Sequence, residues 1–250
     1  STAPGKAATD HAKIGYYTLK APPEFIKRST VISDFALKIP KGEARHKEIA
    51  YLEFPADAYI YTLYPHSHYR GWSVELKQKT SDGKESMLLS LPKYDFNWQR
   101  DYDPIEPILI KKGTKLIATW IYDNSSNNKA NPDSKIDVTW GEQSWQEMMY
   151  FRVNYRWADE TVSNVRNDLQ DKLMDSRMIG ALDNNADNKV QIDELTGTMA
   201  SVSTWISRPR TCPIRESGPS ARRRKCQIAW TPSARLSARR TTTSRKPSSG

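Results

Sequence analysis

Short runs of β-branched and aromatic residues recur through the first two thirds of the chain and constrain its fold more than any other feature. Turn signals separate them at 81–84 (SDGK), 111–114 (KKGT) and 131–134 (NPDS), and no long helical pattern intervenes. Many short strands at this spacing favour an antiparallel β-sandwich or jelly roll over an α/β fold. The nine runs expected to form strands are GYYTLKA (15–21), VISDFALKIP (31–40), EIAYLEF (48–54), AYIYTLY (58–64), WSVELKQ (72–78), SMLLSLP (86–92), TKLIATWIYD (114–123), KIDVTW (135–140) and MMYFRVNY (148–155).

The hydrophobic period changes after Trp157. Apolar residues then recur every three or four positions, which predicts a helix that carries Val162, Val165, Leu169 and Leu173. A second helical stretch is expected to follow. We therefore divide the chain into a mainly β domain at 14–157, a helical segment at 160–206 and a tail at 207–250.

The basic character of the chain is confined to its tail. The formal net charge is +9, of which residues 1–205 contribute −2 and residues 206–250 contribute +11. The body is therefore not expected to bind nucleic acid. The Arg/Ser/Pro-rich tail predicts a disordered extension; an arm that binds nucleic acid or a membrane, and non-native sequence such as a frameshifted end, are alternatives. We assign it no function.

Two further features of the sequence bear on compartment. Both cysteines, Cys212 and Cys226, lie in the tail, so cysteine usage does not indicate the redox compartment. No run approaches the roughly 18–20 apolar residues that a membrane-spanning helix needs.

Residues 183–194, DNNADNKVQIDE, match the twelve-residue calcium loop of an EF-hand with one departure. Position 6, where the template has Gly, is Asn188. This residue must adopt a left-handed backbone conformation, which Asn tolerates better than most residues. The alternative is an acidic helix–loop–helix that binds no calcium. The expected calcium ligands are Asp183, Asn185, Asp187, the Lys189 carbonyl, Gln191 and Glu194.

Two of the four histidines, His66 and His68, are separated by one residue in the segment PHSHYRG (65–71). On a strand, side chains at i and i+2 point to the same face, so both imidazoles could approach one metal ion. Histidines on a strand can equally be solvated or hydrogen-bonded. The β domain lacks the cysteine that a thiolate zinc site needs, and His11 and His46 lie in no matching motif.

Four segments resemble the C-terminal catalytic domain of the type II copper, ascorbate-dependent monooxygenases, the family of peptidylglycine α-hydroxylating and dopamine β-monooxygenases. They are PHSHYRG (65–71), PKYDFNWQ (92–99), YDNSSNNKANPD (122–133) and WGEQSWQEMMYFRVNY (140–155). The resemblance covers about residues 14–157. It implies that His66, His68 and Met148 hold the catalytic copper, which with O₂ and ascorbate hydroxylates a substrate C–H bond. Imidazole suits copper, and a thioether favours Cu(I). Met149 should face the opposite way from Met148.

The sequence also departs from that family. Peptide-amidating members carry Arg before the histidine pair, and Asn and Tyr after the methionine, where this chain has Tyr64, Tyr150 and Arg152. These three are the candidate substrate-binding residues, the substrate itself is unknown, and Arg152 could still bind an anion. Asp95, Trp98, Asp123 and Asn124 are candidates to shape the site or to fix its loops.

The resemblance further implies a second copper in an upstream electron-transfer domain, which this chain does not contain. We therefore expect a fragment of a larger enzyme, extracellular or periplasmic by resemblance. Two alternatives stay open. One is a copper-binding or sensing module without catalysis, and the other is a structural β-sandwich with an attached calcium module and no metal at the histidines.

Overall fold

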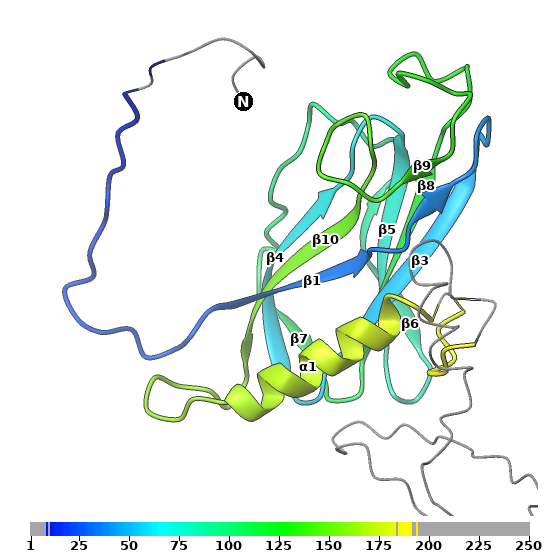
Figure 1. Ribbon diagram of the computed structural model, residues 1–250. Helices are drawn as coiled ribbons and strands as arrows, with labels where there is room; N and C mark the ends of the chain where they lie inside the picture. The colour runs from blue at the N-terminus through cyan, green and yellow to red at the C-terminus, as the bar shows by residue number, and fades with distance from the viewer. Residues whose placement is uncertain (1–8, 10, 184, 192–193, 195–250) are drawn as a thin grey trace, which may run out of the picture.

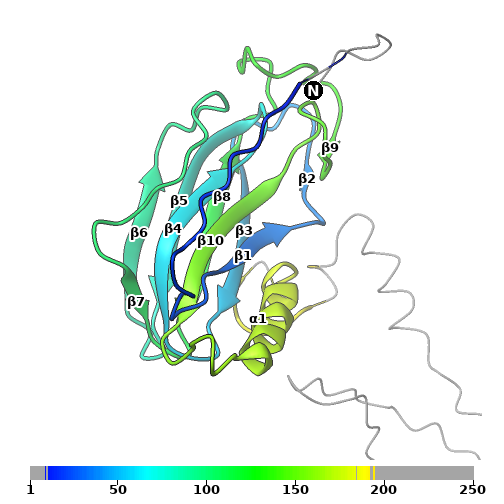
Figure 2. The same ribbon diagram turned by 90° about the vertical axis from the view of Figure 1, so that its left-hand side faces the viewer.

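The chain folds into two antiparallel four-stranded β-sheets that face each other, as seen in a computed structural model that describes residues 9, 11–183, 185–191 and 194 (Figures 1 and 2). The first sheet has the order β1 (Arg28–Asp34), β10 (Met149–Trp157), β4 (Ala58–His66) and β7 (Ile108–Ile110). The second has the order β3 (His46–Glu53), β8 (Lys115–Tyr122), β5 (Gly71–Lys79) and β6 (Glu85–Leu91). A short pair, β2 (Lys38–Ile39) and β9 (Val138–Thr139), lies beside them.

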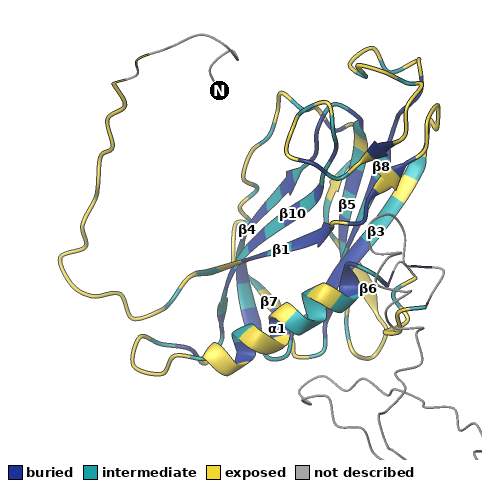
Figure 3. Cartoon of the chain, viewed as in Figure 1, coloured by how far each residue is buried: buried dark blue, intermediate teal, exposed yellow. Residues whose placement is uncertain are grey.

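The core lies between the two sheets because one face of each strand is apolar. In β10 every second residue from Met149 to Trp157 is buried and the residues between are only partly buried. The same alternation runs through β8, where Trp120 is fully buried. Figure 3 shows this burial along both sheets. Period-two alternation therefore confirms the predicted sandwich.

The helix begins later than the hydrophobic spacing predicts. α1 spans Asn167–Gly180, and Leu169 and Leu173 are buried on its inner face. Val162 and Val165 precede it and are each 48% exposed. The Val162 N–H instead donates to the Glu24 carbonyl, 3.0 Å away. The segment around Val162 is therefore bonded to the residues that precede β1 and is not helical.

The predicted strand at 15–21 does not form. Tyr16 and Tyr17 are 83% and 104% exposed, and this segment belongs to an extended arm before β1 (Figure 1). A strand requires a hydrogen-bonded neighbour, and no described strand pairs with the arm. The described strands of the sandwich thus begin at Arg28 rather than near residue 14.

Two of the predicted segments lie outside the described residues, namely the expected second helix after Glu194 and the tail at 207–250. Within the described part, no helix is both long and apolar enough to cross a membrane.

Candidate metal centre

The two histidines meet at the end of β4. His66 is the last residue of that strand, and His68 follows in the turn that leads to β5. Their ring centroids are 5.2 Å apart and their planes are nearly perpendicular, at 87°. Only His66 lies on a strand, so the expected strand geometry is incomplete, but the structure does bring the two imidazoles together.

Each imidazole is oriented by a hydrogen bond at Nδ1. His66 Nδ1 bonds the side-chain oxygen Oε1 of Gln99, and His68 Nδ1 lies 3.3 Å from the Gln146 carbonyl oxygen. Both partners are acceptors, so each Nδ1 carries the proton and each Nε2 keeps its lone pair for a metal. Burial lowers the pKa of both histidines, which favours the neutral form that binds metals.

Along the sequence, Met148 lies between Gln146, which contacts His68, and Tyr150, which contacts His66. Tyr150 pairs with His66 across β10 and β4, with ring centroids 5.8 Å apart. On the other side of Met148, the Gln146 carbonyl contacts His68. Met148 is partly buried, whereas Met149 is fully buried in the core. The backbone of Met148 is close to the histidine turn, because its N–H and the His68 N–H donate to the same Glu147 oxygen, whereas the Met149 side chain points into the core.

Together, the side chains of His66, His68 and Met148 would suit copper better than a metal that prefers oxygen or thiolate ligands. Among the described residues, no group of three or more His, Cys, Asp or Glu side chains is arranged to hold a metal ion. A metal site at the histidine pair that uses only described residues would therefore include a ligand of another type. The Met148 thioether is a soft ligand that, together with imidazole, suits copper.

A buried carboxylate joins the histidine turn to the methionine segment. Glu147 is fully buried. Its Oε1 accepts hydrogen bonds from the Ser67 hydroxyl (2.8 Å), the Met148 N–H (2.9 Å) and the His68 N–H, and its Oε2 accepts one from the Arg70 N–H (3.0 Å). Burial raises the pKa of Glu147 and these four hydrogen bonds oppose that rise.

Further side chains hold the backbone on either side of the site. The buried Tyr94 hydroxyl accepts a hydrogen bond from the Ser67 N–H (3.0 Å) and donates to the Ser67 carbonyl (2.9 Å). The Tyr122 hydroxyl donates to the Met148 carbonyl, 3.0 Å away. The turn is tightly packed, because a Cβ at Gly71 would lie 2.6 Å from Ser67 Oγ.

Residues 92–99 adjoin the histidine turn, but Asp95 and Trp98, the two candidates in this segment, do not make the contacts. Gln99 and Tyr94 contact the histidine turn, whereas Asp95 caps a turn through the Asn97 N–H (2.8 Å) and Trp98 is 63% exposed. Sequence reasoning missed Gln99, Tyr94 and Glu147. Only their presence in the resembling segments could have pointed to them.

The second resembling loop is fixed by its own polar residues. Asn124 accepts a hydrogen bond from the buried Arg70 Nε (2.8 Å) and donates to the Pro40 and Ile136 carbonyls. Asp123 accepts the Ser125 N–H at 2.9 Å. Both therefore fix this loop.

The three candidate substrate-binding residues lie together on the outer face of the first sheet. Tyr64 pairs with Arg152 across β4 and β10, and the guanidinium lies 4.5 Å from the Tyr64 ring centre. The Tyr64 ring is also stacked alongside His66, at 6.3 Å. Arg152 is already paired with Asp101 at 2.6 Å. This face, with the adjoining depression lined by residues 97–101, is the surface next to the histidines.

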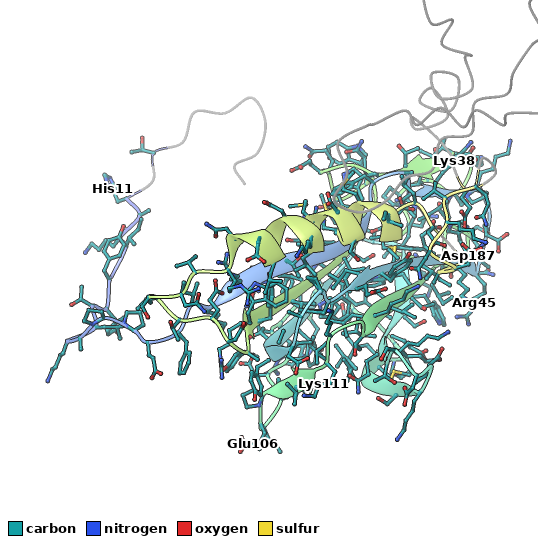
Figure 4. The ribbon with its side chains drawn as sticks, turned by 90° about the horizontal axis from the view of Figure 1, so that it is seen from below. His11, Lys38, Arg45, Glu106, Lys111 and Asp187 are labelled. Atoms are coloured by element: carbon teal, nitrogen blue, oxygen red, sulfur yellow. The ribbon has the colours of Figure 1, made fainter. Side chains whose placement is uncertain are left out.

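The remaining histidines lie elsewhere. His46 begins β3 in the other sheet and bonds Glu48 at 2.6 Å. His11 is on the exposed N-terminal arm, away from the sandwich (Figure 4). Neither is placed to complete the site.

The predicted calcium loop has the expected turn at its sixth position. Asn188 has φ of +68°. Asp183 Oδ2 accepts the Asn188 N–H (2.7 Å), and the two Glu194 carboxylate oxygens accept the N–H groups of Asn185 (3.3 Å) and Gln191 (2.8 Å). The first and last expected ligands are thus folded onto the loop backbone. The described carboxylates are not themselves gathered into a metal-holding group.

The loop is docked on the second sheet. The Tyr51 hydroxyl of β3 donates to Asp183 at 2.6 Å, and Lys115 Nζ of β8 donates to the Ala186 carbonyl at 2.8 Å. Ala186 also has a left-handed φ, +59°, which is costly for a residue other than Gly. Figure 4 shows Asp187 in this loop beside the sandwich.

Comparison with known proteins adds little. No protein-family model and no curated protein matches the chain. Among solved structures, a mitogen derived from Yersinia pseudotuberculosis matches over 56% of this chain and 90% of that chain, with 9% identity and a TM-score of 0.19.

Proposed function

We propose that this chain is the catalytic copper domain of a copper-dependent monooxygenase, with copper held by His66, His68 and Met148. The observation that supports it most is the pair of imidazoles at the end of β4, each fixed through Nδ1 beside the segment that carries Met148. Bound copper would supply O₂ activation for C–H hydroxylation, with ascorbate as the reductant. The family resemblance further suggests a jelly-roll topology for the sandwich.

The residues of the chain have separate roles in this proposal. Gln99 and the Gln146 carbonyl keep the Nδ1 protons in place, so that Nε2 of each histidine is free to bind. Tyr64, Tyr150 and Arg152 would contact the substrate, because they form the outer face beside His66. A second copper domain upstream would deliver electrons, and the protein would work outside the cytoplasm.

Copper stoichiometry tests the proposal most directly. We expect about one copper per chain by elemental analysis, lost in His66→Ala and retained in the matched control His46→Ala, since His46 lies in the other sheet. Met148→Ala should abolish sulfur coordination of Cu(I) in X-ray absorption spectra. Equal copper contents in all variants would contradict the assignment.

Turnover separates an enzyme from a copper sensor. We expect ascorbate-driven O₂ consumption by the longer protein with its upstream domain, and its loss in Met148→Ala. Copper binding without any O₂ consumption would favour the non-catalytic copper module.

A calcium site in residues 183–194 is a second proposal. It is supported by the left-handed Asn188 at the sixth position and by Glu194 closing back onto the loop. The oxygens of Asp183, Asn185, Asp187, Lys189, Gln191 and Glu194 would supply the ligands. Calorimetric titration should detect Ca²⁺ binding that Glu194→Gln abolishes; no heat in the unaltered protein would overturn the assignment.

A further inference from the structure

We propose that Glu147 is a positioning residue that sets the distance between the histidine pair and Met148. The inference rests on the proposed copper function, because it describes how the two parts of that site are held together. Glu147 itself is not a proposed ligand.

The geometry of the carboxylate supports this role. His68 and Met148 come from segments about 80 residues apart in sequence, and one oxygen, Glu147 Oε1, accepts the backbone N–H of both. Any shift of one segment relative to the other would break one of these hydrogen bonds. The Ser67 hydroxyl and the Arg70 N–H, also bound to Glu147, extend the hold over the whole turn from 67 to 70.

The surroundings leave the carboxylate little freedom to move. Glu147 is fully buried, and its own backbone is fixed by the Thr139 carbonyl (3.3 Å) and the Gly141 N–H (3.1 Å). The Met148 carbonyl is bound by Tyr122. Both backbone polar groups of Met148 are therefore held by side chains, which fixes the start of its side chain relative to His68.

The chemistry requires a carboxylate at this position. All four neighbours are donors, and a carboxylate is an acceptor only. Gln has one acceptor oxygen, so its NH₂ group would face either the Arg70 N–H at the Oε2 position or the His68 and Met148 N–H groups at the Oε1 position. Asp keeps the charge but is one methylene shorter and cannot span both segments.

The test compares the Glu147→Gln and Glu147→Asp variants of the 250-residue chain with the unaltered protein. We expect both to bind Cu(I) about 10–100-fold more weakly in competition with a chromogenic Cu(I) chelator, as is typical when the groups supporting metal ligands are altered. X-ray absorption should also show loss of the copper–sulfur contribution. A purely structural residue would not change that spectrum in protein that is still folded.

Glu160→Gln is the matched control, since Glu160 is also a fully buried, multiply hydrogen-bonded carboxylate but lies beyond the far end of β10. It should lower thermal stability and leave Cu(I) affinity and the sulfur contribution unchanged. If the Glu147 variants fail to fold, Ser67→Ala decides the question. That change removes a single donor to Oε1 and should weaken Cu(I) binding about 2–10-fold.

The outcomes separate this inference from the function it rests on. If the unaltered protein binds no Cu(I), or binds it without sulfur, the copper proposal fails and the inference with it. Suppose instead that the unaltered protein binds Cu(I) through sulfur. If the folded Glu147 variants then bind Cu(I) through sulfur with equal affinity, only the inference is overturned. Where the Glu147 variants do not fold, the same result for Ser67→Ala overturns it.

Discussion

Individual side chains govern the candidate copper site through the hydrogen bonds they make to histidine. Gln99 comes from a loop more than 30 residues after His66, yet it fixes the proton of His66 at Nδ1. Gln99 would therefore affect the proposed copper site without touching the metal, because groups that orient a ligating imidazole influence metal affinity. A buried carboxylate such as Glu147 likewise acts through hydrogen bonds, because it holds the backbone N–H groups that donate to it.

Replacing Gln99 should weaken the site without unfolding the protein. In Gln99→Leu the His66 ring loses the acceptor that selects its tautomer, so we expect copper affinity to fall about 10–100-fold. Competitive copper titration measures the change. Trp98→Leu is the control, because Trp98 neighbours Gln99 but is largely exposed. Unchanged affinity in Gln99→Leu would show that this hydrogen bond does not orient the ligand.

The Arg28–Glu160 pair gives a pH-dependent contribution to stability. Two hydrogen bonds from Arg28, at 2.7 and 2.5 Å, hold the pKa of Glu160 below its ordinary value of 4.5. The unfolded chain therefore binds the proton more readily, so the contribution is present above about pH 4.5 and is lost as the pH falls through the folded-state pKa.

The measurement is chemical denaturation of Glu160→Gln and of the unaltered protein at several pH values. We expect Glu160→Gln to destabilise by about 1.5–3 kcal/mol at pH 7, with a smaller difference below pH 4. A difference that stays constant across this range would show that the ion pair does not contribute.

At the scale of secondary-structure elements, α1 can pack closely against β3 because Gly180 has no side chain. A Cβ at Gly180 would lie 1.9 Å from the Tyr51 carbonyl oxygen, which is a backbone atom that cannot turn aside. The Ser176 hydroxyl of the same helix accepts a hydrogen bond from the Glu53 N–H at 2.7 Å. The helix therefore follows β3 closely up to the start of the loop at 183–194.

Gly180→Ala should destabilise the protein despite the better helix propensity of Ala. Propensity alone would stabilise by up to about 1 kcal/mol, but the clash should cost about 1–3 kcal/mol or more as the helix moves away. Thermal and urea denaturation measure the net effect. Asp171→Ala, at an exposed position of the same helix, should show none of this loss. A stabilised Gly180→Ala protein would contradict the close approach.

At the scale of the whole molecule, the loop at 183–194, the proposed calcium site, contacts the sandwich directly. Tyr51 and Lys115 belong to different strands of the second sheet and both bind the loop. An ion bound in the loop would therefore stabilise the sandwich as well as the loop. The loop would act as a structural brace for the β domain.

Calcium should accordingly raise the thermal unfolding midpoint of the sandwich. At a Ca²⁺ concentration 100 times the dissociation constant, the expected stabilisation is about 2.7 kcal/mol. Near-ultraviolet circular dichroism can follow the core, where Trp120 and Trp157 are buried. Glu194→Gln should remove the shift, and Tyr51→Phe should reduce it. A calcium-bound loop with no shift in the sandwich would mean that the two parts are not coupled.

Local patterns in the sequence were sufficient to predict most strands and the turn at Asn188. Alternation with a period of two marks a strand with one buried face, and the loop spacing requires a left-handed residue at its sixth position. Both signals act over a few residues, so they can be read without knowing the fold. The arm at 15–21 has the composition of a strand, but no described strand pairs with it, and there the prediction from local sequence was wrong.

Contacts between distant segments were decided only by the tertiary structure. The sequence itself proposes His66 and His68, and the resemblance adds Met148, but nothing local indicates that Glu147 binds the histidine turn or that Gln99 orients His66. Those hydrogen bonds form because the sheet places β10 beside β4 and because burial requires every donor of the turn to find an acceptor. The chemical types of the site residues are thus set by sequence, and their mutual geometry by the packing of segments far apart along the chain.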